Sequence, residues 1–262
     1  MKSQVFNIKR FGLLLKTELM TGLKKNWISL LLICLIEVIV VLTIGTFFLI
    51  LGQGWNCGGE VSRTIAAVIF LACLVMIVPA KLYGHVNNRE SGPSYLMLPA
   101  SRLEKFISMI LVSVIIIPVA ATGIFAGIDA LLRLLDPTAG GQILRIPNAA
   151  FLTGLSMDGA TMNPALFIDD LIQSLLIFLF GTVFFRSAKV PKTVLCLVVI
   201  GQIVSFIALG GVAIMGFDTN PLDRPMIRFF LDHTALTDTI SDTLTNIGLL
   251  VCIWFKLKTL KF

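Results

Sequence analysis

Long apolar segments limit what this chain can fold into more than any other feature of its sequence. Five runs approach or exceed the roughly 20 residues that a helix needs to cross the hydrocarbon core of a bilayer. They are Ile28–Gly52, Thr64–Leu82, Phe106–Gly127, Ala165–Phe185 and Val194–Phe217. Hydrophobic residues make up 56% of the 262 residues and charged residues only 14%, which is more apolar surface than a soluble core of this length can bury. The sequence therefore predicts an all-α, polytopic membrane protein.

The distribution of basic residues predicts how many times the chain crosses the membrane. A sixth apolar run, Ile247–Phe255, reaches spanning length only when the polar stretch Thr239–Asn246 is included. With six crossings and the N-terminus inside, 16 of the 21 Lys and Arg residues fall in cytoplasmic segments and five fall outside. Because cytoplasmic segments of membrane proteins are enriched in basic residues, we expect six transmembrane helices with cytoplasmic N- and C-termini.

The domain organisation follows from this layout. No internal repeat divides the chain, so we interpret residues 1–262 as a single transmembrane domain. Residues 1–27 are predicted to be a cytoplasmic leader, 28–257 the six-span core and 258–262 a cytoplasmic tail. One helical face of the leader is apolar, and this pattern favours an amphipathic helix lying in the membrane interface; the residues on that face are Ile8, Phe11, Leu15, Leu19 and Leu23. The alternative is a solvated, positively charged leader.

The first apolar run is expected to remain in the protein as a membrane anchor. It is too long and too far from the start of the chain for a cleaved signal sequence, and no small-residue cleavage site follows it.

The predicted cytoplasmic connection between the second and third spans contains the segment "YLMLPASRLEKF". Ser101 is followed three residues later by Glu104, the spacing of a capping box that starts a helix, and Pro99 disfavours helix just before it. Four large apolar residues precede this start and face the cytoplasm with no bilayer assigned to them: Tyr95, Leu96, Met97 and Leu98. They need the membrane surface or another protein as a partner, unless the connection packs against the ends of its own helices.

This layout resembles that of the type-2 ABC exporter permeases, and "YLMLPASRLEKF" is similar to a segment that recurs in bacterial permease-like members of that group. The resemblance implies that the connection is a coupling helix that docks into a separate ABC ATPase subunit, which binds ATP and magnesium. It also implies a second permease chain, identical or not, with a substrate path between the two chains. The expected location is the bacterial cytoplasmic (inner) membrane, with the chain as a multi-pass protein in the lipid bilayer.

The chain itself carries no sequence pattern of an enzyme or of a cofactor site. The Gly-rich "GQGWNCGG" lacks the Lys and the Ser or Thr of a phosphate-binding loop, so ATP hydrolysis is assigned to a partner. His85 and His233 are predicted on opposite sides of the membrane, which excludes a shared metal site. The basic residues flank the spans and form no basic face, so we expect no nucleic-acid partner.

Glu37 is the most unusual polar residue in a predicted span. It lies ten residues after Trp27, about 15 Å along a helix and so near the middle of a core of about 30 Å. An isolated charge there costs at least ~2.5 kcal/mol, and no predicted span places a basic residue at that depth. Glu37 is therefore expected either to be a neutral acid bonded to a neighbouring helix or to face a wet pathway.

Three further polar residues are candidates for the pathway or for intramembrane contacts. Asp169 and Asp170 lie two turns into the fourth span, near its outer end, and Gln202 lies in the fifth. An aspartyl pair formed by Asp129 and Asp169 is a remote enzymatic alternative.

Two other function classes stay open at the level of sequence. One is a non-transporting assembly or signalling component that holds a partner through the same cytoplasmic segment. The other is a proton-coupled carrier that uses Glu37. Co-purification of an ATPase would separate the exporter from both.

Overall fold

The computed structural model of the chain describes residues 7–52, 54–56, 59–87, 97–98, 100–136, 164–214 and 234–259. Within these ranges every regular element is a helix, which confirms the predicted all-α class. In chain order the helices are α1 (Ile8–Cys34), α2 (Ile36–Ile50), α3 (Gly59–Tyr83), α5 (Arg102–Ile110), η1 (Leu111–Ile116), α6 (Ile117–Leu135), α8 (Pro164–Phe184), α9 (Lys189–Ile214) and α11 (Thr234–Thr259).

Several of these helices are long and apolar enough to cross a membrane. In the described part of the chain three segments qualify, Ser62–Tyr83, Arg102–Leu135 and Lys189–Phe206. A fourth is added if the bent pair Asn26–Cys34 and Ile36–Ile50 counts as one span. The fold is therefore that of a helical membrane protein with three or four candidate spans.

The first of the predicted spans is bent. Helix α1 continues without a break through residues 27 and 28, where the sequence predicts a boundary between leader and span. The axis turns instead by 47° between α1 and α2, at Leu35. Backbone hydrogen bonds continue on both sides, from Leu35 N–H to the Leu31 carbonyl at 3.0 Å and from Ile39 N–H to the Leu35 carbonyl at 3.1 Å. Glu37 consequently lies in the first turn after the bend.

Helices α5, η1 and α6 form one continuous rod of 34 residues. At 1.5 Å per residue it is roughly 50 Å long, so its ends project beyond a hydrocarbon core of about 30 Å. Its middle widens into a π-helical turn, in which Ile117 N–H donates to the Val112 carbonyl five residues earlier. Because Pro118 has no N–H and its ring crowds the carbonyl of Val114, the wider turn accommodates this proline without breaking the rod.

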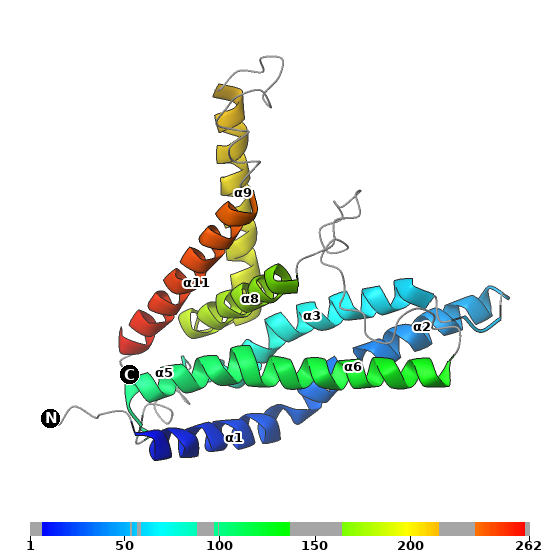
Figure 1. The fold of residues 1–262 in the computed structure, drawn as a ribbon, viewed down its shortest axis with the longest axis horizontal. Coiled ribbons are helices and arrows are strands. Elements are labelled where there is room, and N and C mark those ends of the chain that lie inside the picture. Colours follow the sequence, from blue (N-terminus) through cyan, green and yellow to red (C-terminus); the bar gives the residue numbers. More distant parts are fainter. Residues whose placement is uncertain are drawn as a thin grey trace.

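The core lies where α3 and α8 face each other and their neighbours. Both helices bury residues at intervals of four, which lie on one helical face. On α3 these are Ala66, Phe70, Leu74, Val78 and Leu82, and on α8 they are Leu175, Leu179 and Val183. Phe70 also stacks on Phe125 of α6, with ring centroids 4.3 Å apart. Helices α1, α3 and α6 contact one another and run side by side in Figure 1.

Helix α9 departs from this body. Its first turns contact α8 and α3, and beyond them it points away from the other helices (Figure 1). Its large apolar side chains are exposed around the helix: Leu195, Val198, Ile200, Ile203, Val204 and Phe206. A helix that is apolar on all sides needs lipid or another protein around it.

One end of the molecule gathers the segments that charge counting assigns to the cytoplasm. Phe106 of α5 contacts Trp254 of α11, with ring centroids 5.4 Å apart. Lys256 Nζ lies 4.9 Å from the ring centroid of Phe184, at the end of α8. The C-terminal end of α3 meets α1 at the same place, where Asn26 Nδ2 donates to the Lys81 carbonyl at 3.2 Å. Helix ends that are far apart in the sequence therefore meet at one end of the bundle.

Candidate functional site

The start of α5 has the predicted capping box. The Ser101 hydroxyl oxygen accepts a hydrogen bond from Glu104 N–H at 3.2 Å, and Glu104 Oε2 accepts one from Ser101 N–H at 2.8 Å. Two backbone donors at the helix start are thereby satisfied. The sequence prediction that a helix begins just after Ser101 is confirmed.

Glu104 also binds α1, which the sequence does not predict. Its carboxylate is fully buried and accepts from Asn7 N–H at 2.9 Å, from Arg10 Nε at 2.9 Å and from Arg10 Nη2 at 2.7 Å. A bidentate pair of Arg with a carboxylate fixes both distance and orientation. The hydrogen bond to Glu104 raises the pKa of the Arg10 guanidinium, so this cation persists at every physiological pH.

A second contact ties α1 to both helices that flank the connection between α3 and α5. Glu18 Oε2 accepts from the Tyr83 hydroxyl at 2.8 Å and from the Ser108 hydroxyl at 2.7 Å. Tyr83 is the last residue of α3, and Ser108 lies in the second turn of α5. Through Glu18 and Arg10, α1 therefore joins the helix that enters the connection to the helix that leaves it.

The turn between α8 and α9 holds the first residues of the connection. Lys189 Nζ donates to the Gly84 carbonyl, and Asn87 Nδ2 donates to the Phe184 carbonyl at 3.0 Å. Ala188, with φ of 48°, adopts the left-handed conformation that makes this turn tight. We use the term connection clamp for the contacts of Arg10, Glu18, Phe184 and Lys189 with the connection and its flanking helices.

The predicted apolar docking residues are described only in part. Tyr95 and Leu96 lie outside the described residues. Met97 is 82% exposed and Leu98 is 37% exposed, directly ahead of the clamped start of α5. The described part of this segment is therefore on the surface and is attached to a firmly held helix.

A polar cluster lies at the opposite end of α3 and α6. Asp129 accepts from Arg63 through both Nε, at 2.6 Å, and Nη2. Glu37 is 1% exposed and is in hydrogen-bonding contact with Asp129. Arg133, one turn further along α6, adds a second cation near Glu37. The expectation that no span offers Glu37 a basic residue at its depth is therefore wrong, since Arg63 and Arg133 lie on helices beside it.

Helix length explains this correction. In the sequence-based prediction the second span begins at Thr64 and the third ends at Gly127. Arg63 and Arg133 were therefore assigned to outer loops. In the structure α3 begins at Gly59 and α6 ends at Leu135, so both arginines lie on helices. The bend at Leu35 brings Glu37 into the same cluster.

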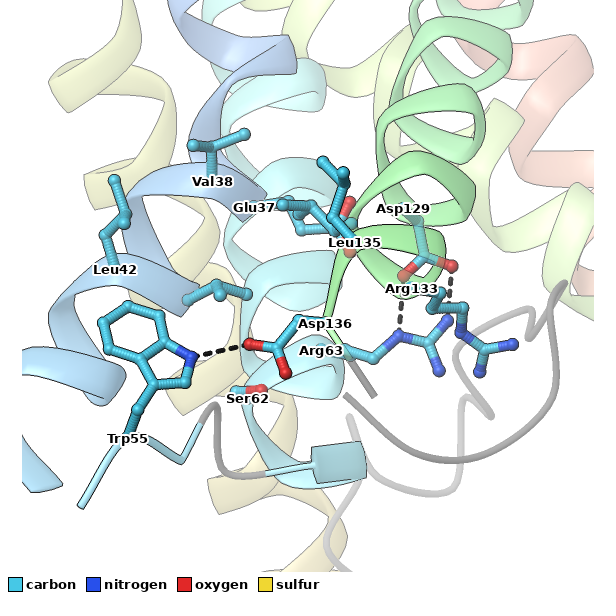
Figure 2. Close-up of a pocket in the computed structure, with 12 residues that line it drawn as sticks. Glu37, Val38, Leu42, Trp55, Ser62, Arg63, Asp129, Arg133, Leu135 and Asp136 are labelled. Atoms are coloured by element: carbon cyan, nitrogen blue, oxygen red, sulfur yellow. Dashed lines mark hydrogen bonds and ion pairs between the residues drawn. The ribbon is translucent and has the colours of Figure 1, made fainter. Parts of the chain in front are cut away.

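The cluster lines a cavity of about 160 Å³ between α2, α3 and α6. Figure 2 shows Glu37, Arg63, Asp129 and Arg133 around it, with the aliphatic side chains of Val38, Leu42 and Leu135 on its walls. At the rim, Trp55 Nε1 donates to Asp136 Oδ2 at 2.6 Å. Trp55 is 41% exposed, so the buried Glu37 lies at the floor and Trp55 at the surface.

Gly45 lets the Trp55 ring lie directly on α2. A Cβ atom at residue 45 would lie 2.7 Å from Trp55 Cη2, closer than side chains pack. A glycine is therefore needed here for close contact rather than for an unusual backbone angle.

The other polar residues singled out in the sequence do not join this cavity. Asp169 Oδ1 accepts from Asn246 Nδ2 at 3.1 Å, which links α8 to α11, and Asp170 is exposed on α8. Gln202 is exposed on α9. Since Asp129 is bound to Arg63 and Asp169 to Asn246, these two aspartates do not form an aspartyl pair.

In the described residues no group of three or more His, Cys, Asp or Glu side chains could hold a metal ion. Comparison with known proteins gave no match to a protein-family model, a curated protein or a solved structure. Function is therefore inferred from the helices and their side-chain contacts.

Proposed function

We propose that the chain is the membrane-spanning permease subunit of an ABC-type exporter, driven by a separate ATP-binding subunit that docks on the cytoplasmic connection. The connection clamp is the observation that carries this proposal. An apolar segment that receives force from a partner must be attached firmly at both ends, because a loose loop would absorb the movement.

The clamp supports this requirement because directional bonds hold the two ends of the connection. On the entry side, Lys189 and Phe184 hold residues 84 and 87. On the exit side, Glu104 accepts two side-chain bonds from Arg10 and backbone bonds from residues 7 and 101. A push on Met97 and Leu98 would therefore be passed to α1 and to the α5–α6 rod rather than lost in the loop.

The proposed orientation has six crossings with both termini in the bacterial cytoplasm. Its support is that the ends of α3, α8 and α11 and the start of α5 meet at one end of the molecule, together with their basic residues. These residues include Lys81, Arg102, Lys105, Lys189 and Lys256. In the proposed orientation these positive charges face the cytoplasm, the side on which membrane proteins are enriched in Lys and Arg.

A second permease chain is part of the proposal. Helix α9 presents large apolar side chains that are more than half exposed, and beside Gly201 no atom from beyond its own stretch of helix lies within 4 Å of where a Cβ would be. Small residues on a lipid-facing helix permit close approach of a second helix. A substrate path between two chains is consistent with this open surface.

The test is co-purification of the full-length protein from its native membrane. In mild detergent a Walker-motif ATPase should co-purify with the chain and hydrolyse ATP in the complex. Replacing Met97 and Leu98 together by Ser should remove most of the bound ATPase, because each buried side chain contributes at most ~1.5–3 kcal/mol to docking. Membrane insertion should be unchanged.

Leu131→Ser with Leu134→Ser is the matched control, since both residues are exposed at the other end of α6. That pair should retain the ATPase. Ser101→Ala should weaken the complex less than the Met97 and Leu98 pair, because a lost cap costs about 1 kcal/mol.

Full ATPase recovery with the Met97 and Leu98 pair would contradict docking at this segment. A co-purifying partner without a Walker motif would instead favour the assembly or signalling class.

A further inference from the structure

A groove of about 500 Å³ runs between α1 and α6, two helices that contact each other and lie side by side (Figure 1). Every residue that lines it is hydrophobic. Helix α6 contributes two small side chains there, those of Ala120 and Ala121, which cannot fill the space beside α1. Because an apolar space does not hold ordered water, we expect an apolar group to occupy the groove.

The length of the groove matches one leaflet of a bilayer. Along α1 its lining extends from Leu23 to Leu35, about 18 Å at 1.5 Å per residue, and one leaflet is ~15 Å of a hydrocarbon core of about 30 Å. The groove ends at Leu35, where the axis turns by 47°. Near its start lies Trp27, which is 58% exposed, and tryptophan is common at the boundary between lipid headgroups and acyl chains.

Two lysines extend the face of α1 that lines the groove. Lys16 lies two turns before Leu23, and Lys24 lies one turn before Trp27, so both project from the same helical face as the lining residues. Both side chains are exposed. In the described part of the chain neither side chain has a hydrogen bond or an ion pair. Free positive charge is therefore present at the start of an apolar groove.

The acidic residue of α1 does not neutralise these lysines. Glu18 is the only Asp or Glu in this helix, and it lies two residues after Lys16, which is the opposite side of the helix. Its carboxylate accepts hydrogen bonds from Tyr83 and Ser108 there. The start of the groove is therefore basic, which favours an occupant with a negatively charged head.

We propose that the groove between α1 and α6 binds one anionic phospholipid, with an acyl chain between the two helices and the phosphate beside Lys24. Lys16 adds positive charge two turns away. Basic residues that flank pockets between membrane helices recognise anionic headgroups in this way. A neutral lipid would fill the groove but leave both lysines without a counter-charge.

A second copy of the chain fits this groove less well than a lipid does. A symmetric contact would place the same lysines of two chains against each other, and like charges repel. The surface proposed above for a second chain is on α9, which does not line the groove. Assignment of the lipid to the cytoplasmic leaflet rests on the proposed orientation, but binding itself does not, so failure of the test below leaves the exporter proposal standing.

The experiment uses the full-length protein in phosphatidylcholine nanodiscs, with Trp55 and Trp254 replaced by Phe so that Trp27 is the single indole. Bromine atoms on an acyl chain quench an indole that they touch. A small fraction of brominated phosphatidylglycerol should quench Trp27 and the effect should saturate, whereas the same fraction of brominated phosphatidylcholine should quench it little. Added salt should weaken the effect of phosphatidylglycerol, because exposed charges are screened.

Removing the two charges tests the role of the lysines. Lys16→Gln with Lys24→Gln should reduce the preference for phosphatidylglycerol by about fivefold or more, since each Lys near an anionic lipid surface contributes a factor of about five. Lys192→Gln with Lys258→Gln is the matched control. Both of these lysines are exposed and neither lines the groove, so the preference should be unchanged.

Filling the groove tests the place of the acyl chain. Ala120 is exposed and lines the groove, so Ala120→Phe narrows it without altering a charge. Quenching of Trp27 by brominated phosphatidylglycerol should fall, although both lysines remain.

Three results would overturn the proposal. Equal quenching by the two brominated lipids at every fraction would show only the general lipid surroundings of Trp27. An unchanged preference in the Lys16 and Lys24 pair would show that these residues do not bind the headgroup. No quenching by either lipid would show that protein, rather than lipid, covers the groove.

Discussion

Two buried glutamates show how differently the same side chain is used in this protein. Glu37 and Glu104 are both almost fully buried. Glu104 accepts hydrogen bonds from Asn7, Arg10 and Ser101, so its charge is compensated and its position fixed. Glu37 keeps one unpartnered oxygen in a cavity. The first therefore has a structural role in the clamp, whereas the second is bonded to Asp129 and keeps one oxygen without a partner beside the cavity.

The Arg63–Asp129 pair is largely buried at the end of the bundle that holds the cavity, so removing one partner should destabilise the fold. Both side chains are close to 10% exposed, so Arg63→Met would leave a carboxylate with little water to compensate it. Breaking a buried pair in this way costs about 3 kcal/mol. We expect a clear fall in the thermal unfolding midpoint, and a partial recovery when Asp129→Asn is added.

Arg102→Met is the control for this prediction, because Arg102 is exposed and exposed substitutions usually change stability by about 0.5 kcal/mol or less. Equal unfolding midpoints for the Arg63 and Arg102 variants would contradict the assignment.

At the scale of helices, the α8–α9 turn positions both α9 and the start of the connection. Helices α8 and α9 approach closely where Gly181 faces Thr193, whose hydroxyl donates to the Lys189 carbonyl at 2.8 Å. Lys189 in turn donates to Gly84. A substitution at this helix crossing should therefore also alter the contacts of the connection clamp.

Gly181→Ala should push α8 and α9 apart. The new Cβ would lie 2.8 Å from Thr193 Cγ2 and closer still to its hydroxyl oxygen. Overpacking of this kind costs about 1–3 kcal/mol, and we expect a lower unfolding midpoint together with weaker partner binding. Thr193→Ala in the same chain removes two of the three crowding atoms and leaves Thr193 Cβ, 2.9 Å away, so it should restore part of the loss.

Gly248→Ala is the matched control on α11, since a Cβ there would meet no atom within 4 Å. It should be neutral or slightly stabilising, because alanine favours helix by up to about 1 kcal/mol over glycine. A Gly181 variant as stable as the Gly248 variant would show that the two helices do not meet closely at this point.

At the scale of the whole molecule, the two ends of the bundle carry different chemistry. One end holds the clamp and the exposed Met97, and the other holds the polar cavity with Trp55 at its rim. Tyr83, which bonds to Glu18, lies on α3 at the first end, and Arg63 lies on α3 at the second. The two residues are about 20 residues apart along the helix, or roughly 30 Å. This separation matches the thickness of a hydrocarbon core.

The proposed orientation predicts which end reacts from outside. In a protein whose native cysteines are replaced by Ala, Met97→Cys should resist a membrane-impermeant thiol reagent in intact cells and react after the membrane is opened. Asn56→Cys, at the exposed outer end beside Trp55, should react in intact cells. The reverse labelling would invert the topology and place the clamp outside.

Local patterns in the sequence determined the helices and where one of them begins. Apolar runs of spanning length predicted α3, the α5–α6 rod and α9, because helix formation and membrane spanning both depend on residues that are consecutive in the sequence. The spacing of Ser101 and Glu104 predicted the capping box, because its bonds close within three residues.

Tertiary structure alone decided the contacts of the functional candidates. Glu104 and Arg10 are 94 residues apart, and Glu37, just after the bend between α1 and α2, meets Asp129 of α6, 92 residues further along the chain. Arg63 and Arg133 lay beyond the apolar runs, so hydropathy placed them in loops, whereas packing extended α3 and α6 far enough to bury Arg63 against Asp129. Hydropathy reports where a segment leaves the apolar core, but a helix continues for as long as neighbouring helices satisfy its polar side chains.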